Sequence, residues 1–257
     1  MRTKPSKWER LRRLSWISVF KTLRLNFSLL PFHQAVRFPV IITRSSTIAS
    51  VRGRIKITCP IEPGLIRFGY LHSDLMSWRS GKTFIKIDGM WTIGGRIQFG
   101  VGTQLVIDSK SFFETGNDIC IGANAKIICR EKISIGNYFR AAWDVQIFDT
   151  NFHYTKNMET GLIKKRTKPV LIGNNNWLAN RASIMQGTKT NDYLIIASNS
   201  MCNKNYSELP YFSMIGGTPA KLCATNVYRV LDKEEIEIDS LFEQSGDDCI
   251  VTDTSHL

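Results

Sequence analysis

Apolar residues recur at every sixth position through the middle of the chain. The series covers Ile87 to Leu105, Ile121 to Ile147 and Ile172 to Cys202. Its members are Ile87, Ile93, Phe99, Leu105, Ile121, Ile127, Ile133, Ile135, Ala141, Ile147, Ile172, Leu178, Ile184, Thr190, Ile196 and Cys202, with the phase restarting at Ile135. A helix repeats at 3.6 residues and a lone strand at 2, so neither keeps phase with a period of six.

A six-residue period is typical of short strands separated by tight turns, in which the same apolar position always points inward. Glycine often follows the apolar residue, as in Ile93-Gly94, Ile121-Gly122 and Ile172-Gly173, and permits a sharp turn. The pattern predicts an all-β protein, a parallel β-helix of triangular section. The sequence of an ordinary β-sandwich would instead show apolar and polar residues in alternation, broken by turns at irregular intervals.

Three segments flank or interrupt the repeat. Residues 1–56 predict a basic helical leader, and residues 57–225 the solenoid. Residues 154–169, "YTKNMETGLIKKRTKP", are too polar for coils and predict a loop that leaves the solenoid and covers a groove. Residues 226–257 predict a helix from Val227 to Gln244, which we expect to cap the solenoid, and then a disordered acidic tail.

The net charge of +12 lies entirely at the N-terminus, where residues 1–56 carry thirteen Lys and Arg against Glu9. On a helix, Arg10, Arg13, Lys21 and Arg24 form one stripe beside tryptophan and leucine residues. Such a stripe favours peripheral contact with an anionic membrane through residues 1–27 rather than binding to nucleic acid. Packing of this helix on its own domain or on a neighbouring subunit is the alternative, and both stay open.

The six cysteines lie far apart without a CxxC pair, which favours reduced thiols. Lys21 interrupts the apolar stretch after the basic start, so we expect no cleaved secretion signal, and no apolar run has the length of a membrane span. These features predict a cytoplasmic protein with peripheral contact at the inner face of a bacterial membrane.

One long segment resembles a known family. "IGNNNWLANRASIMQGTKTNDYLIIASNSMCNKNYSELPYFSMIGGTPAK", Ile172 to Lys221, is similar to the closing coils of the hexapeptide-repeat acyltransferases. Looser hexads extend the resemblance back to about Thr83, and "LNFSLLPFHQAVRFPV" is similar to the leader of surface-polysaccharide acyltransferases. The resemblance implies a left-handed β-helix that forms a homotrimer with active sites between subunits, acetyl-CoA or another acyl-CoA as donor, and a saccharide hydroxyl as acceptor.

By position, His153 matches the family's catalytic histidine, and the chemistry needs such a residue. A base with a pKa near neutrality removes the hydroxyl proton during attack on the thioester, and the imidazolium then protonates the leaving thiolate. Asp149 or Asn151 would orient the ring, although a backbone carbonyl would serve equally, and an Asx-type turn is the alternative role for Asp149. Asn124 lies near a family position that binds the acceptor, two residues out of register.

Trp177 occupies the family's tryptophan position, where its ring would stack on the acceptor or line the site of the pantetheine. The alternative is that Trp177 is an aromatic residue that caps the core. Further carried-over positions concern the donor. They are Ala179 and Ala197, where small residues let the pantetheine lie close, and the closing motif Thr218, Pro219, Ala220 and Lys221, with Lys221 near a phosphate. Thr190 and Cys202 depart from the usual isoleucine or valine, which weakens the repeat near the donor end.

Other functions fit the chain less well. A zinc carbonic anhydrase on this helix requires three convergent histidines, whereas His153 is the only histidine within the repeat, so we expect no metal. The first eighty residues carry no Gly-rich phosphate loop for a nucleotidyltransferase. The sequence therefore predicts an acyl-CoA-dependent O-acyltransferase acting on a saccharide or polysaccharide precursor. The alternatives are an N-acyltransferase acting on an amino sugar and a non-catalytic structural solenoid.

Overall fold

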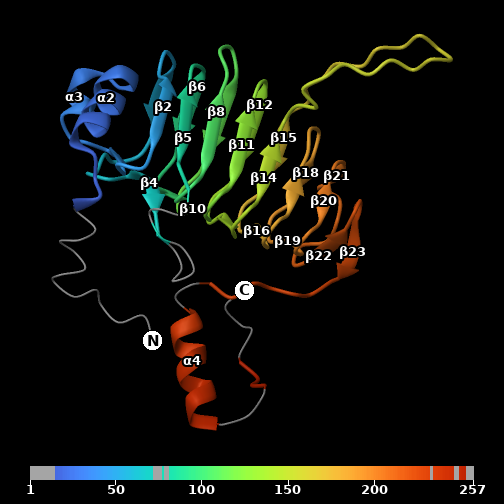
Figure 1. Cartoon of the computed structure of the whole chain (residues 1–257). Coiled ribbons are helices and arrows are strands. Elements are labelled where there is room, and N and C mark those ends of the chain that lie inside the picture. Colours follow the sequence, from blue (N-terminus) through green and yellow to red (C-terminus); the bar gives the residue numbers. More distant parts are fainter. Residues whose placement is uncertain (1–14, 72–76, 78–80, 232–233, 246–248, 253–257) are drawn as a thin grey trace.

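The computed structural model describes residues 15–71, 77, 81–231, 234–245 and 249–252. Within these residues, short strands form three sheets that wind around one axis as a solenoid (Figure 1). All neighbouring strands are parallel except the last pair, β22 and β23. The fold is the left-handed parallel β-helix, which confirms the predicted fold class.

We number the sheets in chain order. The first sheet contains β1 (Val40–Ile42), β4 (Ile66–Tyr70), β7 (Ile97–Gly100), β10 (Ile119–Ile121), β13 (Arg140–Ala141), β16 (Trp177–Leu178), β19 (Ile195–Ile196), β22 (Met214–Gly217) and β23 (Ala220–Ala224). The second sheet contains β2 (Thr47–Ser50), β5 (Phe84–Ile87), β8 (Gln104–Ile107), β11 (Lys126–Cys129), β14 (Gln146–Phe148), β17 (Ser183–Ile184) and β20 (Met201–Cys202). The third sheet contains β3 (Arg54–Ile57), β6 (Met90–Ile93), β9 (Phe112–Thr115), β12 (Lys132–Ile135), β15 (Val170–Ile172), β18 (Lys189–Thr190) and β21 (Asn205–Tyr206).

The register explains the six-residue period. Trp177 pairs with Ile195, eighteen positions later, so one late coil contains three hexads. Ile121 pairs with Ala141, twenty positions later, because the third-sheet strand of that coil buries two residues, Ile133 and Ile135. The six-residue pattern restarts at Ile135 because Ile135 is this second inward-pointing residue.

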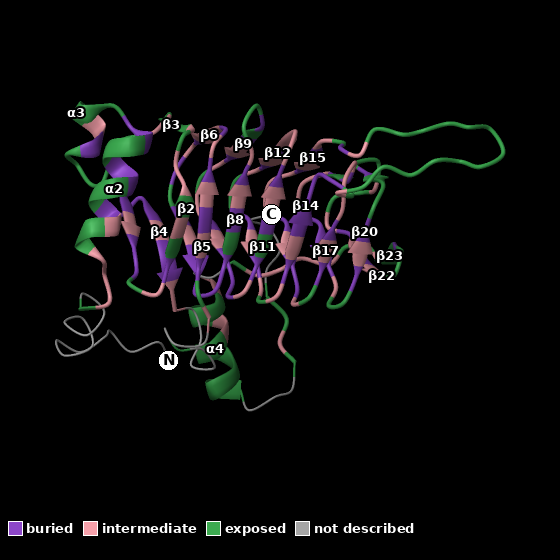
Figure 2. Ribbon diagram, turned by 45° about the horizontal axis from the view of Figure 1, so that its top comes forward, coloured by how far each residue is buried: buried purple, intermediate pink, exposed green. Residues whose placement is uncertain are grey.

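The core consists of the inward residues stacked coil upon coil, drawn as the buried positions in Figure 2. Leu105, Ile127 and Ile147 occupy one such column in the second sheet. In the earlier coils Trp91 is fully buried, packs against Phe99 and Phe113, and donates its indole N–H to Thr115 Oγ1 at 3.0 Å. The buried polar end of Trp91 is therefore paired, as a core tryptophan requires.

Helices and a hairpin close the ends of the solenoid. Helix α2 (Val19–Leu29) places Leu25 and Leu29 in the core at the N-terminal end, and α3 (Phe32–Ala35) follows it. The antiparallel pair β22 and β23 closes the other end. Helix α4 (Glu234–Ser245) buries no side chain and lies away from the coils (Figure 1).

Two expected boundaries differ from the structure. Strands β1 to β3 already form a coil between residues 40 and 57, so the solenoid begins within the segment assigned to the leader. The expected helix from Val227 to Gln244 is seen from Glu234 to Ser245, and it buries none of its side chains, so no packing against the coils supports its expected role as a cap. The basic residues Arg10 and Arg13 of the expected N-terminal stripe lie outside the described residues.

Candidate active site

His153 lies on a turn that hydrogen bonds hold to the solenoid. The buried Thr150 accepts a hydrogen bond from the Phe152 amide at its Oγ1, at 3.0 Å, and the His153 amide donates to the Asn151 carbonyl at 2.7 Å. Phe152 has a φ of +63°, in the left-handed region that is unfavourable for an aromatic residue. Its ring packs on Phe148 at 5.7 Å, and this contact helps to hold the strained turn. The imidazole of His153 is exposed at the end of this turn.

Asp149 holds the same turn to the preceding coil. Its fully buried carboxylate accepts hydrogen bonds from the Arg130 amide at 2.8 Å and from the Glu131 amide at 2.7 Å. Burial raises the pKa of the Asp149 carboxyl, and the neighbouring backbone amides act against that rise. Within the described residues no hydrogen bond joins this carboxylate to His153. No contact in the structure therefore supports the predicted role of Asp149 in orienting the imidazole. The contacts that Asp149 does make anchor the turn.

The loop predicted at residues 154–169 is a projecting two-stranded hairpin (Figure 1). Bridges between Lys156 and Ile163 and between Thr150 and Thr167 join its two sides. Its base carries an ion pair from Lys165 to Glu131 at 2.9 Å. The Asn151 amide donates to the Arg166 carbonyl, so Asn151 is a backbone element of the hairpin base. The hairpin therefore starts directly beside His153.

The residues expected to bind the donor gather at another corner, between the first and second sheets. The Ala179 amide donates to the Ile196 carbonyl and the Ala197 amide to the Ile215 carbonyl, which stacks Ala179, Ala197 and Gly216 in one column. A Cβ added to Gly216 would lie 3.2 Å from the Ala197 Cβ. Small residues therefore occupy the same position in three successive coils.

The closing motif lies at the end of this column of small residues. Thr218 donates its hydroxyl to the Asn199 carbonyl at 3.3 Å, at the same corner, and the Thr218–Pro219 peptide bond is cis. Ala220 is fully buried beneath the turn, whereas Lys221 is exposed on β23. The structure thus brings all six predicted donor residues to one edge of the molecule, with one cationic side chain at its end.

Trp177 and Asn124 belong to this side of the molecule as well. Trp177 points outward from the first sheet, two residues before Ala179, and the Arg229 guanidinium lies over its ring at 5.7 Å. Trp177 is therefore not the core-capping aromatic of the alternative reading. Asn124 has a φ of +57° at the first–second corner, which asparagine tolerates better than most residues. That conformation is a sufficient reason for an asparagine there.

The two halves of the predicted site lie apart in one chain. The left-handed residue Asp144 marks the first–second corner, and Asp149 marks the corner between the second and third sheets. Five residues at about 3.3 Å each separate them by roughly 16 Å. Proton transfer needs contact at about 3 Å. A donor bound along Ala179 and Ala197 is therefore beyond the reach of His153 unless it crosses the second sheet.

One group of residues was missed from the sequence. Tyr193, Phe212 and Tyr228 form an aromatic cluster with ring centroids 4.8 to 6.3 Å apart, and Arg229 follows directly. The Tyr193 and Phe212 positions follow the third sheet in successive coils, and this spacing is visible in the sequence. The segment that brings Tyr228 and Arg229 onto them has no periodic signal.

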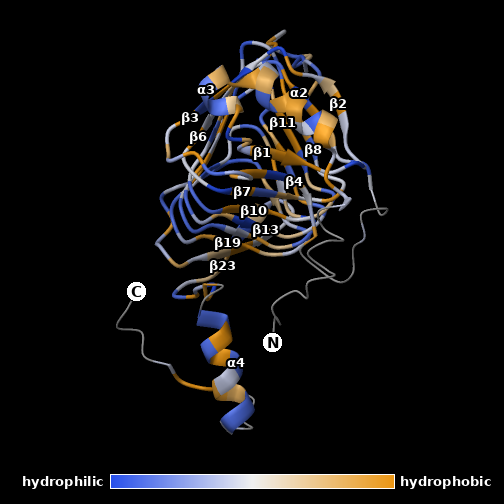
Figure 3. Ribbon diagram, turned by 90° about the vertical axis from the view of Figure 1, so that its left-hand side faces the viewer, coloured by the Kyte–Doolittle hydropathy of each residue, from blue (hydrophilic) through white to orange (hydrophobic). Residues whose placement is uncertain are grey.

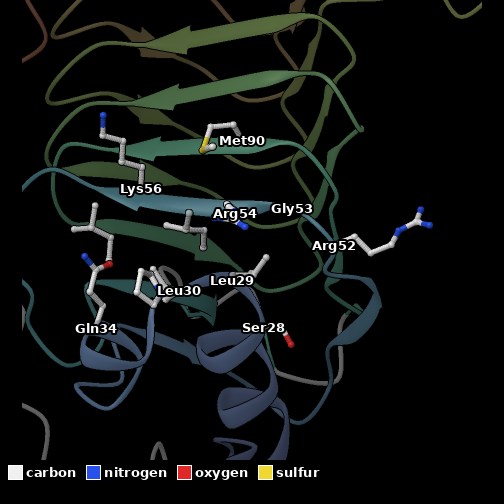
Figure 4. Close-up of a pocket in the computed structure, with 12 residues that line it drawn as sticks. Ser28, Leu29, Leu30, Gln34, Arg52, Gly53, Arg54, Lys56 and Met90 are labelled. Carbon is white, nitrogen blue, oxygen red and sulfur yellow. The ribbon is translucent and has the colours of Figure 1, made fainter.

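A separate hollow of about 690 Å³ lies near the N-terminal end, between the α2–α3 segment and β3 (Figure 4). Its lining includes Leu29, Gln34, Arg54 and Lys56. No residue predicted for acyl transfer lines it. Among the described residues, no group of three or more His, Cys, Asp or Glu could hold a metal ion. Nor is any described helix sufficiently long and apolar to span a bilayer.

The structure is similar to solved acetyltransferases. The polySia specific acetyltransferase NeuO is matched over 83% of this chain and 91% of its own, with 16% identity and a TM-score of 0.56. The polysialic acid O-acetyltransferase OatWY is matched over 78% and 95%, with 19% identity and a TM-score of 0.45. No family model and no curated protein matches the chain. At 16% identity the likeness to NeuO shows the fold alone, the left-handed parallel β-helix that the repeat predicts.

Proposed function

We propose that the protein is an acyl-CoA-dependent O-acyltransferase, with acetyl-CoA as donor and a saccharide or polysaccharide precursor as acceptor. The observation that carries the proposal is the gathering of the closing-motif residues. Ala179, Ala197 and the turn of residues 218–221 lie along one edge. A purely structural solenoid does not require these residues to gather beside an exposed lysine. NeuO, which has this fold, is an acetyltransferase specific for polySia, and that supports an acidic saccharide as acceptor.

In this proposal His153 takes the proton from the acceptor hydroxyl as its oxygen attacks the thioester carbonyl. The new bond joins oxygen to the acyl carbon, the carbon–sulfur bond breaks, and the imidazolium returns the proton to the thiolate. The pantetheine lies along Ala179 and Ala197, and Lys221 binds a phosphate of the nucleotide. Trp177 contributes ring surface to the acceptor or to the pantetheine, and Asn124 and Asn151 stay candidates for acceptor contacts.

We further propose that the active form is a homotrimer. Because roughly 16 Å separates His153 from the residues proposed to bind the donor in its own chain, a neighbouring subunit is the simplest source of the opposite wall. The projecting hairpin supports this arrangement. An isolated two-stranded hairpin is marginally stable in water, and this one exposes Met158, Leu162 and Ile163. A neighbouring solenoid would cover them. A cytoplasmic location with peripheral contact of residues 1–27 at the membrane is part of the same proposal.

The decisive experiment replaces His153 with alanine. Turnover, measured as thiol release with acetyl-CoA and a panel of acidic oligosaccharides, nucleotide sugars and lipid-linked sugars, should fall about 10²- to 10⁴-fold. Thermal stability should stay unchanged, because the imidazole is exposed and forms no hydrogen bond with any residue that the structure describes. His33→Ala, an exposed histidine on α3, is the matched control. Turnover of His153→Ala at the parental rate would rule out the mechanism.

Two further measurements separate the alternatives. Mild alkali releases an O-acyl ester from the product but not an N-acyl amide, which decides between the hydroxyl and an amino sugar. Mixing His153→Ala with Trp177→Ala subunits tests the shared site. If sites combine residues of two subunits, random assortment should restore about one quarter of parental activity. No restoration would place the whole site within one chain.

A further inference from the structure

The N-terminal cap of the solenoid exposes an unusual amount of aromatic surface. Phe20 is 77% exposed and Phe32 is 73% exposed, and both belong to the cap helices α2 and α3. We name this surface the outer aromatic face. It consists of Val19, Phe20, Leu23, Phe27, Phe32, Val36 and Phe38, all exposed. Figure 3, which views the molecule from this end, shows hydrophobic positions along both helices.

Helix α2 carries apolar residues on its outward side as well as on its buried side. The buried residues are Thr22, Leu25, Asn26 and Leu29, whereas Val19, Phe20, Leu23 and Phe27 are exposed. Asn26 donates its side-chain amide to the Val40 carbonyl at 2.8 Å and accepts from the Val40 amide at 3.1 Å. These bonds pair the edge of β1 and fix the rotation of the helix. The outward apolar residues are therefore held toward solvent by the buried polar contacts.

The outer aromatic face is continuous rather than a set of single residues. The ring centroids of Phe27 and Phe32 lie 5.9 Å apart, and those of Phe27 and Phe38 lie 6.4 Å apart. The face lies opposite Leu25 and Leu29, which enter the core, so it points away from the coils. Contiguous exposed apolar patches on a folded protein mark interaction sites.

The charge around this face has one sign. No Asp or Glu occurs between Glu9 and Glu62. Arg24 and Arg37 are exposed beside the phenylalanines, and Arg54 and Lys56 line the neighbouring hollow (Figure 4). Within the described residues no acidic side chain pairs with any of these four. Lys21 is the exception to the expected basic stripe, because its ammonium turns inward to the Arg44 and Ser46 carbonyls.

We propose that the outer aromatic face docks on an anionic lipid bilayer. Phenylalanine and leucine side chains enter the boundary between headgroups and acyl chains, while the surrounding arginines contact anionic headgroups. A second copy of this face fits less well, because pairing it with itself would bring Arg24 and Arg37 against their own counterparts. The surface is separate from the proposed acyl-transfer site. The inference rests on the membrane contact proposed above for residues 1–27, names the side chains that make it, and extends it to Phe32, Val36 and Phe38.

The test uses the full chain and vesicles of phosphatidylcholine, either alone or with phosphatidylglycerol, in a sedimentation assay. The parent should bind the anionic vesicles, and Phe20→Ser combined with Phe32→Ser should lower the partition coefficient at least about tenfold. Phe112→Ser is the matched control, because Phe112 is 53% exposed on β9, away from the cap. Arg24→Glu with Arg37→Glu should weaken binding similarly, whereas Lys126→Glu with Lys189→Glu, two exposed lysines on β11 and β18, should not.

Several outcomes would overturn the inference. These are equal binding of the parent to neutral and anionic vesicles, no binding to either, and binding that the phenylalanine pair does not change. Loss of subunit assembly by the phenylalanine pair, measured by light scattering, would identify the face as a protein contact instead. His153→Ala should bind vesicles like the parent, so a failure of the acyl-transfer proposal is distinguishable from a failure of this one.

Discussion

Replacing Asp149 with asparagine tests how one buried carboxylate holds the turn that carries His153. The parent carboxylate accepts from the Arg130 and Glu131 amides through both of its oxygens, at 2.7 to 3.0 Å. Asparagine has nearly the same shape but keeps one acceptor oxygen. Its NH₂ group then faces a backbone N–H, so one buried donor loses its partner.

The size of the effect follows from two opposing contributions. A hydrogen bond to a charged group contributes about 1.5–3 kcal/mol, and a buried donor without a partner costs about 1–3 kcal/mol. Against this, the variant no longer buries a charge, and burial is the cause that raises the pKa of Asp149. We therefore expect the free energy of unfolding to fall by about 1–3 kcal/mol at neutral pH, measured by urea denaturation.

The pH dependence gives the sharper test. Because the pKa of Asp149 is raised on folding, the native state binds more protons than the unfolded state between the ordinary value of 3.8 and the raised value. The contribution of this group to stability is therefore fully present below about pH 4 and declines as the pH rises through the folded pKa. The difference in unfolding free energy between the parent and Asp149→Asn should therefore become smaller as the pH rises.

Asp144→Asn is the control, since the Asp144 side chain forms no hydrogen bond within the described part of the chain and its φ of +60° suits asparagine. It should change stability by less than about 0.5 kcal/mol at every pH. If the difference in unfolding free energy between the parent and Asp149→Asn grows as the pH rises, the reasoning is refuted. The backbone amides would then stabilise the charged carboxylate more than burial destabilises it.

Three further changes probe the rest of the fold. Burial acts to raise the pKa of Asp88, but hydrogen bonds led by that from Arg52 outweigh it and bring the pKa to about 2. Its stability contribution is present above about pH 4 and lost toward pH 2, so Asp88→Asn should flatten the acid limb of urea unfolding curves. Trp91→Phe removes the bond to Thr115 and should lower unfolding free energy by about 1–3 kcal/mol in thermal melts. Burial raises the pKa of the Cys129 thiol, so mass spectrometry should find it unmodified by a thiol reagent that labels the exposed cysteines.

The repeat made the fold predictable where coils are regular. From Leu171 to Met201 paired residues lie eighteen positions apart, which is three hexads, so the sequence period coincides with the register there. The first coils could not be located in this way. Val40 pairs with Ile66 and Ile66 with Ile97, so these coils contain long connections that break the period. The packing of the C-terminal helix could not be predicted for another reason. A pattern of apolar residues predicts a helix, but it does not predict what the helix packs against.

The candidate site residues could be named from the sequence one by one, but their arrangement could not. The motif singled out His153 and the residues proposed to bind the donor, because both stand at fixed positions relative to the hexads. It did not give the contact of Asp149 with amides eighteen and nineteen positions earlier, since contacts between coils leave no local pattern. Arg229 over Trp177 was missed similarly, because the chain reaches that ring from beyond the last coil.

The position of the hairpin explains how a regular solenoid can carry an exposed histidine outside its coils. The excursion leaves and rejoins the coil at adjacent points, since the Lys168 amide donates to the Asp149 carbonyl and the Asn151 amide to the Arg166 carbonyl. With the two ends joined, the length of the insertion hardly affects the stacking of coils, because the entropy of closing a loop grows slowly with its length. His153 lies two residues beyond Asn151, on the hairpin side of this junction. The Phe152 amide, bonded to the buried Thr150, ties the turn of His153 to the solenoid, so the place of His153 depends on the junction rather than on the length of the hairpin beyond it.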